Sequence, residues 1–448
     1  MKYMLEMMYI WARNNRIRAA LSVLAIAILA ATAWVLWFIH SFQRANLISK
    51  AGIYDMAWSP DGNSLAVSER GFEEKGATIP DSLRILSWNN GALQINQSIP
   101  LNSATGQLSW SPDGDWIGSL QRPNVLHTFQ LSSGRIFQPF GQEQAAVSFA
   151  WSLPPTSTND PAGPEVVGME KDESPKTEMF LRARRAGESE SSPSRFHIQL
   201  QEAQIQAGTF SSCNIIRILP EGIVRHLSAS TEHNSSLRSK VSVQDIRAEA
   251  PGGFQAAGSE ITQIFRCDAP CPAELELSLS QDGTTMALMN CTFGVSAQFD
   301  LWNLKEGKIV QTLAVPRQLE PGIDIRPAWN PFHKFGNSAW SSDDKHFAAA
   351  ILLWDSQKQP NGCLLAWWDV ASGKLLAAKQ VWMFNQNFLM VRAEQRALPI
   401  AMWRGCWSPS LDRVALWRRI QISAPGFPEY NCQRSIVSVV PAPPEAIP

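Results

Sequence analysis

The feature that most constrains the fold is a short turn sequence that recurs along the chain. It reads AWSPDG at 57–62, SWSPDG at 109–114, SLSQDG at 278–283, AWSSDD at 339–344 and CWSPSLD at 406–412, with a damaged copy, AWSLPP, at 150–155. Proline presets φ for the second position of a type I turn, aspartate hydrogen-bonds its local backbone, and glycine tolerates positive φ. Because strand-forming residues flank the turns, each copy predicts a β-hairpin.

The polar residues of these turns have a structural and a chemical interpretation. A catalytic carboxylate is expected once in a chain, whereas Asp61, Asp113 and Asp282 recur at one position of the repeat; calcium or catalytic use is the alternative to a structural turn. Repetition therefore favours the structural interpretation. The residues that we assign to structural turns are Pro60, Asp61, Gly62, Pro112, Asp113, Gly114, Asp282 and Gly283.

A second hairpin pattern follows the first in four of the repeats. It occupies 84–95, 127–140, 301–313 and 366–381, and its turns contain Gly91, Gly134, Gly307 and Gly373. Apolar and β-branched residues flank each turn, where glycine can adopt the left-handed conformation. Two consecutive hairpins form one four-stranded antiparallel sheet, which is the blade of a β-propeller.

The repeated W-S-P-D-G-x-x-L-A, followed by a strand ending in W-x-x-x-x-G-K, resembles the WD-repeat and TolB-like β-propeller families. The resemblance covers residues 53–440 and implies an all-β propeller. The Gly-His dipeptide that often opens a WD repeat is missing. A literal Trp-Asp pair occurs only at 354–355 and 368–369. We therefore transfer the fold from the resemblance and no functional residue.

The spacing of the turns predicts about seven blades, with six or eight as alternatives. Signature positions fall at Trp58, Trp110, Trp151, Leu279, Trp340 and Trp407. A blade needs roughly 40 to 45 residues, so the interval from 151 to 279 is too long for one. It contains the segment 154–194, which is rich in Pro, Glu, Ser and charge. This composition predicts a disordered insertion.

The N-terminal region carries the second strong signal. Residues 19–39 contain no charge and are long enough to cross about 30 Å of hydrocarbon as a helix. Four basic residues precede this segment and only Arg44 and Lys50 follow it closely. This bias predicts a cytoplasmic lead at 1–18, a single-pass signal anchor, a connector at 40–52 and a propeller on the extracytoplasmic side, periplasmic or extracellular.

Two other interpretations of the apolar segment stay open. Ala31-Thr32-Ala33 has the small-x-small form of a signal-peptide cleavage site. A buried core helix is the third interpretation, although an all-β propeller offers no pocket for a fully apolar helix. The long basic lead and the continuation of the apolar run to Ile39 favour an uncleaved anchor.

The seven cysteines leave several states open. Cys267 and Cys271, in the sequence CDAPC, could close a disulfide loop in an oxidising compartment, stay as thiols, or supply half of a metal site. A zinc site needs four ligands, and no second close pair or nearby histidine completes one. We therefore predict no metal and no cofactor.

No catalytic motif is present in the sequence. The patterns GxSxG, HExxH, GxxxxGK[ST] and GxGxxG are absent, and the seven histidines are scattered. A net charge of −1 provides no overall basic field, so nucleic acid is not expected as a partner. These observations favour a protein that is not an enzyme.

Two further segments are expected to be solvent-exposed. Arg182, Arg184 and Arg185 lie among glutamates, which is typical of a solvated loop, although a docking loop for a partner protein is the alternative. The Pro-rich segment 441–448 is expected to be a disordered tail because proline cannot donate ladder hydrogen bonds.

We therefore expect a membrane-tethered propeller that serves as a protein–protein interaction platform, or as a subunit of a membrane or envelope complex. One alternative is a ligand-binding sensor or enzyme with its site at the mouth of the propeller channel, since such sites have no local motif. Another is an intracellular WD-type adaptor with reversed topology.

Overall fold

The computed structural model describes the ring-forming part of the chain with several gaps. The described ranges are 46–49, 52–74, 77–103, 105–121, 125–140, 145–151, 164–171, 179–187, 196–200, 212–218, 223–232, 238–249, 253–256, 261–266, 277–292, 296–316, 338–354, 360–382, 403–424 and 427–446, with 3–4, 6–7, 28–29 and 31–33 near the N-terminus.

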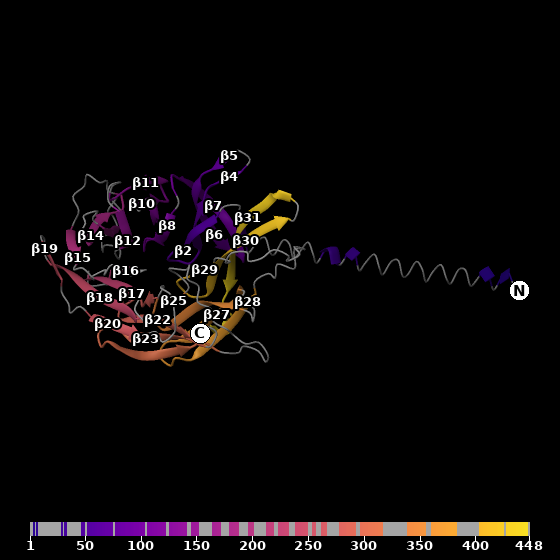
Figure 1. The fold of residues 1–448 in the computed structure, drawn as a ribbon. Helices are drawn as coiled ribbons and strands as arrows, with labels where there is room; N and C mark the ends of the chain where they lie inside the picture. The colour runs from indigo at the N-terminus through magenta and orange to yellow at the C-terminus, as the bar shows by residue number, and fades with distance from the viewer. Residues whose placement is uncertain are drawn as a thin grey trace.

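The described chain is almost entirely antiparallel β-structure (Figure 1), and the main sheets are meanders, with an insertion in sheet 1 and a strand from the other end of the chain in sheet 7. Sheet 1 contains β2 (Gly52–Trp58), β3 (Ser64–Arg70), β6 (Asp81–Asn89) and β7 (Ala92–Leu101). A two-stranded ribbon, β4 (Phe72–Glu74) and β5 (Ala77–Ile79), is inserted between β3 and β6. Sheet 2 contains β8 (Thr105–Trp110), β9 (Trp116–Gln121), β10 (Val125–Gln130) and β11 (Arg135–Phe137).

The next two sheets lie in the interval for which the sequence shows no complete repeat. Sheet 3 contains β12 (Ala145–Trp151), β13 (Glu165–Lys171), β14 (Met179–Arg185) and β15 (Phe196–Leu200). Sheet 4 contains β16 (Ser212–Ile218), β17 (Ile223–Glu232), β18 (Arg238–Glu249) and β19 (Gly253–Ala256), and β20 (Ile261–Arg266) pairs with the other end of β18.

The C-terminal half of the ring contains three sheets. Sheet 5 contains β21 (Leu277–Leu279), β22 (Thr285–Thr292), β23 (Ser296–Asn303) and β24 (Lys308–Ala314). Sheet 6 contains β25 (Ser338–Trp340), β26 (His346–Trp354), β27 (Pro360–Asp369) and β28 (Leu375–Trp382). Sheet 7 contains β29 (Trp403–Trp407), β30 (Arg413–Ala424), β31 (Phe427–Pro441) and, from the other end of the chain, β1 (Asn46–Ser49).

The first strands of the sheets face a common centre. Contacts between first strands run from β21 through β25, β29, β2, β8 and β12 to β16. Between sheets 4 and 5, Arg225 of β17 donates a hydrogen bond to the carbonyl of Gly283 in the turn after β21. Figure 1 shows the sheets arranged around this centre. The arrangement is that of an all-β propeller, as the sequence predicts.

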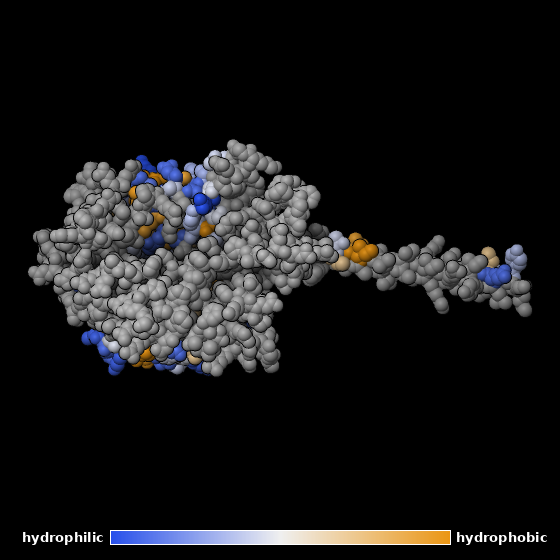
Figure 2. Space-filling model, viewed as in Figure 1, coloured by the Kyte–Doolittle hydropathy of each residue, from blue (hydrophilic) through white to orange (hydrophobic). Residues whose placement is uncertain are grey.

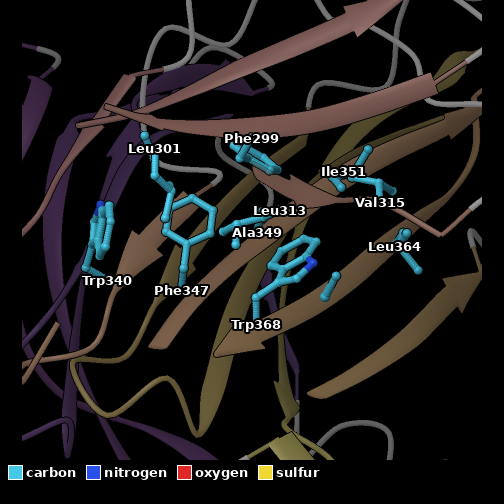
Figure 3. Packing of buried hydrophobic residues seen from close by; sticks show 12 residues of the cluster. Phe299, Leu301, Leu313, Val315, Trp340, Phe347, Ala349, Ile351, Leu364 and Trp368 are labelled. Carbon is cyan, nitrogen blue, oxygen red and sulfur yellow. The ribbon is translucent and has the colours of Figure 1, made fainter. Parts of the chain in front are cut away.

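The hydrophobic core is divided among the interfaces between neighbouring sheets. In Figure 3, aromatic and aliphatic side chains of sheet 5 pack against those of sheet 6. The side chains of this interface include Phe299, Leu301, Leu313, Trp340, Phe347 and Trp368. Similar clusters lie between sheets 6 and 7, 7 and 1, 1 and 2, and 2 and 3. Large aromatic rings therefore fill the wedge between neighbouring sheets.

Gly118 of β9 is required by the close approach of sheet 3. A Cβ atom at this position would lie 2.3 Å from Cε2 of Phe149 and 3.1 Å from Cζ2 of Trp151. We predict that Gly118→Ala lowers the free energy of unfolding by about 1–3 kcal/mol through overpacking. Gly52→Ala is the control, because its nearest neighbour is Cβ of Arg70 at 3.9 Å. Equal denaturant midpoints for the two variants would contradict the prediction.

Part of the predicted disordered insertion at 154–194 forms strands instead. β13 pairs with both β12 and β14, and Val166 and Val167 are buried. The prediction was wrong because it used the composition of the whole segment. Two short runs within it, EVVGMEK and MFLRARR, contain enough β-forming residues to add strands to the sheet. The rest of the insertion lies outside the described residues.

The predicted connector and tail also need correction. Residues 46–49 of the predicted connector 40–52 form β1, which pairs with Ser435–Ser438 of β31. In the predicted tail 441–448, Pro444–Ala446 form a 3₁₀ helix, and Ala446 is buried between sheets 6 and 7. The amide of Ala442 donates to the carbonyl of Asp412 at 2.7 Å. The tail packs because its alanines, unlike its prolines, contribute both an amide donor and small apolar side chains.

The predicted membrane segment falls mostly outside the described residues. Its described positions, 28–29 and 31–33, are helical, and the hydroxyl of Thr32 donates to the carbonyl of Ile28 at 2.8 Å. Within the part of the chain that the structure describes, no helix has the length and apolar character needed to cross a membrane.

Candidate functional site

The recurring turn is held by a serine–aspartate pair. In sheet 1, the hydroxyl of Ser59 donates to the carboxylate of Asp61 at 2.5 Å and accepts from the amide of Ser64 at 2.9 Å. The same carboxylate accepts from the amide of Asn63 at 3.0 Å. Gly62 has φ of 70° and donates to the Ser59 carbonyl at 2.9 Å. The hydroxyl of Ser59 and the carboxylate of Asp61 are thereby used within the turn.

The same geometry recurs in four other sheets. The serine-to-aspartate hydrogen bonds are Ser111–Asp113 at 2.5 Å, Ser280–Asp282 at 2.6 Å, Ser341–Asp343 at 2.7 Å and Ser408–Asp412 at 2.6 Å. The predicted turn residues therefore do not converge on one pocket. The structure places them one set per sheet, at the turn between its first and second strands.

Hydrogen bonding lowers the pKa of four of these carboxylates, those of Asp61, Asp282, Asp343 and Asp412. The hydroxyl of Ser341 and then the amide of Lys345 lower the pKa of Asp343 to about 2. At Asp61, burial raises the pKa, but donors from Ser59 and Asn63 outweigh this effect and lower the pKa below its ordinary value. The pKa values of Asp282 and Asp412 are lowered by comparable sets of donors, which outweigh burial. Such carboxylates are acceptors for the turn and poor proton donors near neutral pH.

The lowered pKa values predict how stability responds to acid. A carboxylate with a lowered folded pKa stabilises the fold above its unfolded pKa, and this contribution is lost as the pH falls through the folded pKa. For Asp343 the window lies between 3.8 and about 2. We expect Ser341→Ala to be less stable than wild type at pH 5, and the difference to shrink towards pH 2. Urea unfolding at a series of pH values measures this difference, and parallel curves would contradict the assignment.

Turns of neighbouring sheets also contact one another. The carboxylate of Asp344, in sheet 6, accepts from the amides of Gln281 and Asp282 in sheet 5 at 2.6 and 2.8 Å. A Cβ atom added to Gly114 would lie 4.0 Å from Cδ of Pro60, and one added to Gly62 would lie 3.8 Å from Cδ of Pro409. The proline of one turn therefore lies close to the glycine of the next. These first turns and the short turns between the third and fourth strands lie on one face of the ring, which we call the turn face.

The signature tryptophans carry a bond that sequence reasoning missed. The indole N–H groups of four of them donate to carbonyls in the first strand of the preceding sheet: Trp58 to Cys406 at 2.9 Å, Trp110 to Ala57 at 2.8 Å, Trp151 to Ser109 at 3.1 Å and Trp340 to Ser278 at 3.3 Å. Each acceptor immediately precedes the signature residue of its own strand. This constant one-residue offset, together with the recurring tryptophan, is a sequence signal that could have predicted these indole hydrogen bonds, which we call the indole ladder.

Of the remaining predicted site residues, the structure describes the arginines but not the cysteine pair. Arg182, Arg184 and Arg185 lie on β14 and pair with residues of β13, so their backbone is in a strand rather than in the predicted loop. Cys267 and Cys271 lie outside the described residues. Within the described chain, no group of three His, Cys, Asp or Glu side chains is arranged to hold a metal ion.

Comparison with known proteins does not add to the fold assignment. No protein-family model matches the chain, and no curated protein matches it. A solved structure of U3-55K resembles it with a TM-score of 0.46 and 12% sequence identity, covering 88% of this chain and 98% of that chain. The fold assignment therefore rests on the strand order and the contacts between sheets.

Proposed function

We propose that this chain is a membrane-tethered propeller, with sheets 1 to 7 as its seven blades, which serves as a platform for other proteins. Residues 19–39 anchor it as a single-pass helix, and the propeller lies on the extracytoplasmic side. Its turn carboxylates are structural, and the chain acts by binding rather than by catalysis.

The observation that carries this proposal is the position of β1. This strand starts only a few residues after the apolar segment and pairs with β31 over Asn46–Ser49. Residues 40–45 span at most about 25 Å when fully extended, because each residue adds no more than about 3.6 Å. A helix at 19–39 would therefore hold the propeller against the membrane surface.

The chemistry of the apolar segment supports its place in lipid. Two of its described side chains, those of Ile28 and Leu29, are 56% and 69% exposed. They form the apolar patch on the N-terminal extension in Figure 2. Exposed aliphatic side chains on an uncharged helix are unfavourable in water and favourable in hydrocarbon.

The rigidity of the ring supports a platform. Antiparallel sheets that share aromatic interfaces and the indole ladder hold the loops of different blades at fixed positions. Fixed loops reduce the ordering cost that a partner must overcome on binding. Partners would then recognise combinations of side chains from several blades.

The anchor is tested by substitution within the apolar segment. We expect the full chain to remain in membranes after alkaline extraction and the double variant Ile28→Arg/Leu29→Arg to be released. Ile28→Leu/Leu29→Ile is the matched control and should behave as wild type. Release of the wild-type chain would contradict the tether.

The platform is tested by cross-linking in intact membranes. We expect the full chain to cross-link a reproducible set of proteins that is lost when residues 46–448 are replaced by an unrelated soluble domain behind the same 1–45 segment. Recovery of the same set with the replacement protein would contradict a binding role for the propeller.

A further inference from the structure

The proposed tether leaves open which surface of the propeller meets the bilayer. The ring has a turn face, a face opposite to it, and a rim formed by the outermost strands. The following inference rests on the membrane anchor proposed above and concerns the orientation of the ring.

The anchor joins the propeller at its rim. In sheet 7 the strand order is β1-β31-β30-β29, and β29 contacts the first strands β2 and β25. β1 is therefore the outermost strand, farthest from the centre of the ring. β1 also contacts β7, the outermost strand of sheet 1. With a connector of at most about 25 Å, this part of the rim cannot move far from the membrane.

The rim beside β1 has a surface that suits a lipid interface. β7 has the sequence ALQINQSIPL and carries no charge, so its exposed residues are polar or apolar but neutral. Ile95 is 52% exposed. Asn96 is an extra residue in the strand, because Ile85 and Leu86 pair with Gln97 and Ile95 respectively. A bulge of this kind keeps an exposed edge strand from pairing with another sheet.

The turn face has a different chemistry. It carries the carboxylates of the repeated turns. Asp343 and Asp412 form ion pairs with Lys345 and Arg413, whereas among the described residues Asp61 and Asp113 have hydrogen-bond donors but no Lys or Arg in a salt bridge. The lowered pKa keeps Asp61 negative. A membrane surface that contains anionic lipids attracts basic segments and repels acidic ones within about one Debye length. Docking of the turn face on such a surface is therefore disfavoured.

We infer that the propeller stands edge-on to the bilayer, with the rim formed by β1 and β7 against the lipid headgroups. Both faces of the ring are then open to the aqueous compartment. Partner proteins can approach either face without competing with the membrane.

The test uses two rim positions that are equivalent in the repeat. Val310 of β24 is the extra residue opposite Leu301 and Trp302, just as Asn96 is in β7, and it is 47% exposed. A fluorescent amino acid is placed at position 96 or 310 of the full chain. Each protein is reconstituted into vesicles of phosphatidylcholine and phosphatidylglycerol that carry an acceptor dye on a headgroup.

An edge-on ring predicts a large loss of donor fluorescence at position 96 and a small loss at position 310. Similar losses at the two positions would overturn the edge-on orientation, because a ring lying on either face holds its whole rim at one height. A larger loss at 310 would overturn it as well. Failure of the protein to float with the vesicles would instead overturn the proposed anchor, so the two failures are distinguishable.

Discussion

A chain that begins at residue 51 is expected to unfold at a lower denaturant concentration than a chain that begins at residue 45. Both lack the apolar segment, but only the second retains β1, which pairs with Ser435–Ser438 of β31. Each hydrogen bond contributes about 0.5–1.5 kcal/mol net, so the four-residue strand accounts for about 2–5 kcal/mol in the free energy of unfolding. The pairing also joins the two ends of the ring, because β1 and β31 come from opposite ends of the chain.

Urea unfolding followed by tryptophan fluorescence measures this difference. The chain beginning at residue 45 is the control for loss of the apolar segment itself, and it should match the full chain in detergent. If both shortened chains unfold at the same urea concentration, β1 makes no contribution to the closure of sheet 7. The topology of that sheet would then be wrong.

Trp368→Ala is expected to lower the free energy of unfolding by about 3–5 kcal/mol, the range for truncation of a large buried aromatic side chain. Trp368 is fully buried between sheets 5 and 6, with ring centroids 5.8 Å from Phe299 and 6.1 Å from Phe347 (Figure 3). Its indole N–H also donates to the carbonyl of Ala314 in sheet 5 at 3.1 Å. The substitution therefore removes apolar contact and leaves that carbonyl without its donor.

Trp368→Phe separates these two contributions. Phenylalanine keeps most of the apolar contact but has no N–H, so we expect a smaller loss of about 1–3 kcal/mol from the unmet hydrogen bond. Thermal and urea unfolding of the two variants provide the comparison. A loss below about 1 kcal/mol for Trp368→Ala would mean that the interface between sheets 5 and 6 is not packed as described.

The sequence predicted those parts of the fold that depend on local chemistry. The Ser-Pro-Asp-Gly turns, their glycines with positive φ and the apolar strands beside them lie where the repeats place them. The structural role of Asp61 and Asp113 also follows from repetition alone. These features are local because a turn and its two strands use donors and acceptors within a few residues of each other.

The features that were missed depend on partners far away in the sequence. β1 is four residues long and has no turn or periodic pattern of its own, and its strand identity comes from β31 at the opposite end of the chain. β13 and β14 lie in a polar segment and become strands through pairing with each other and with β12. The bond from Trp110 to Ala57 joins successive repeats, so neither repeat reveals it alone.

The most direct test of ring closure is a disulfide between the two ends of the propeller. Ile48 of β1 pairs with Ile436 of β31, whereas Val437 is one residue out of register and its side chain points to the other face of the strand. The double variant Ile48→Cys/Ile436→Cys should cross-link on mild oxidation, giving a faster-migrating band on a non-reducing gel that mass spectrometry assigns to this pair. Ile48→Cys/Val437→Cys should not. Cross-linking of neither pair, or of the second pair in preference, would contradict a ring closed by β1 and β31.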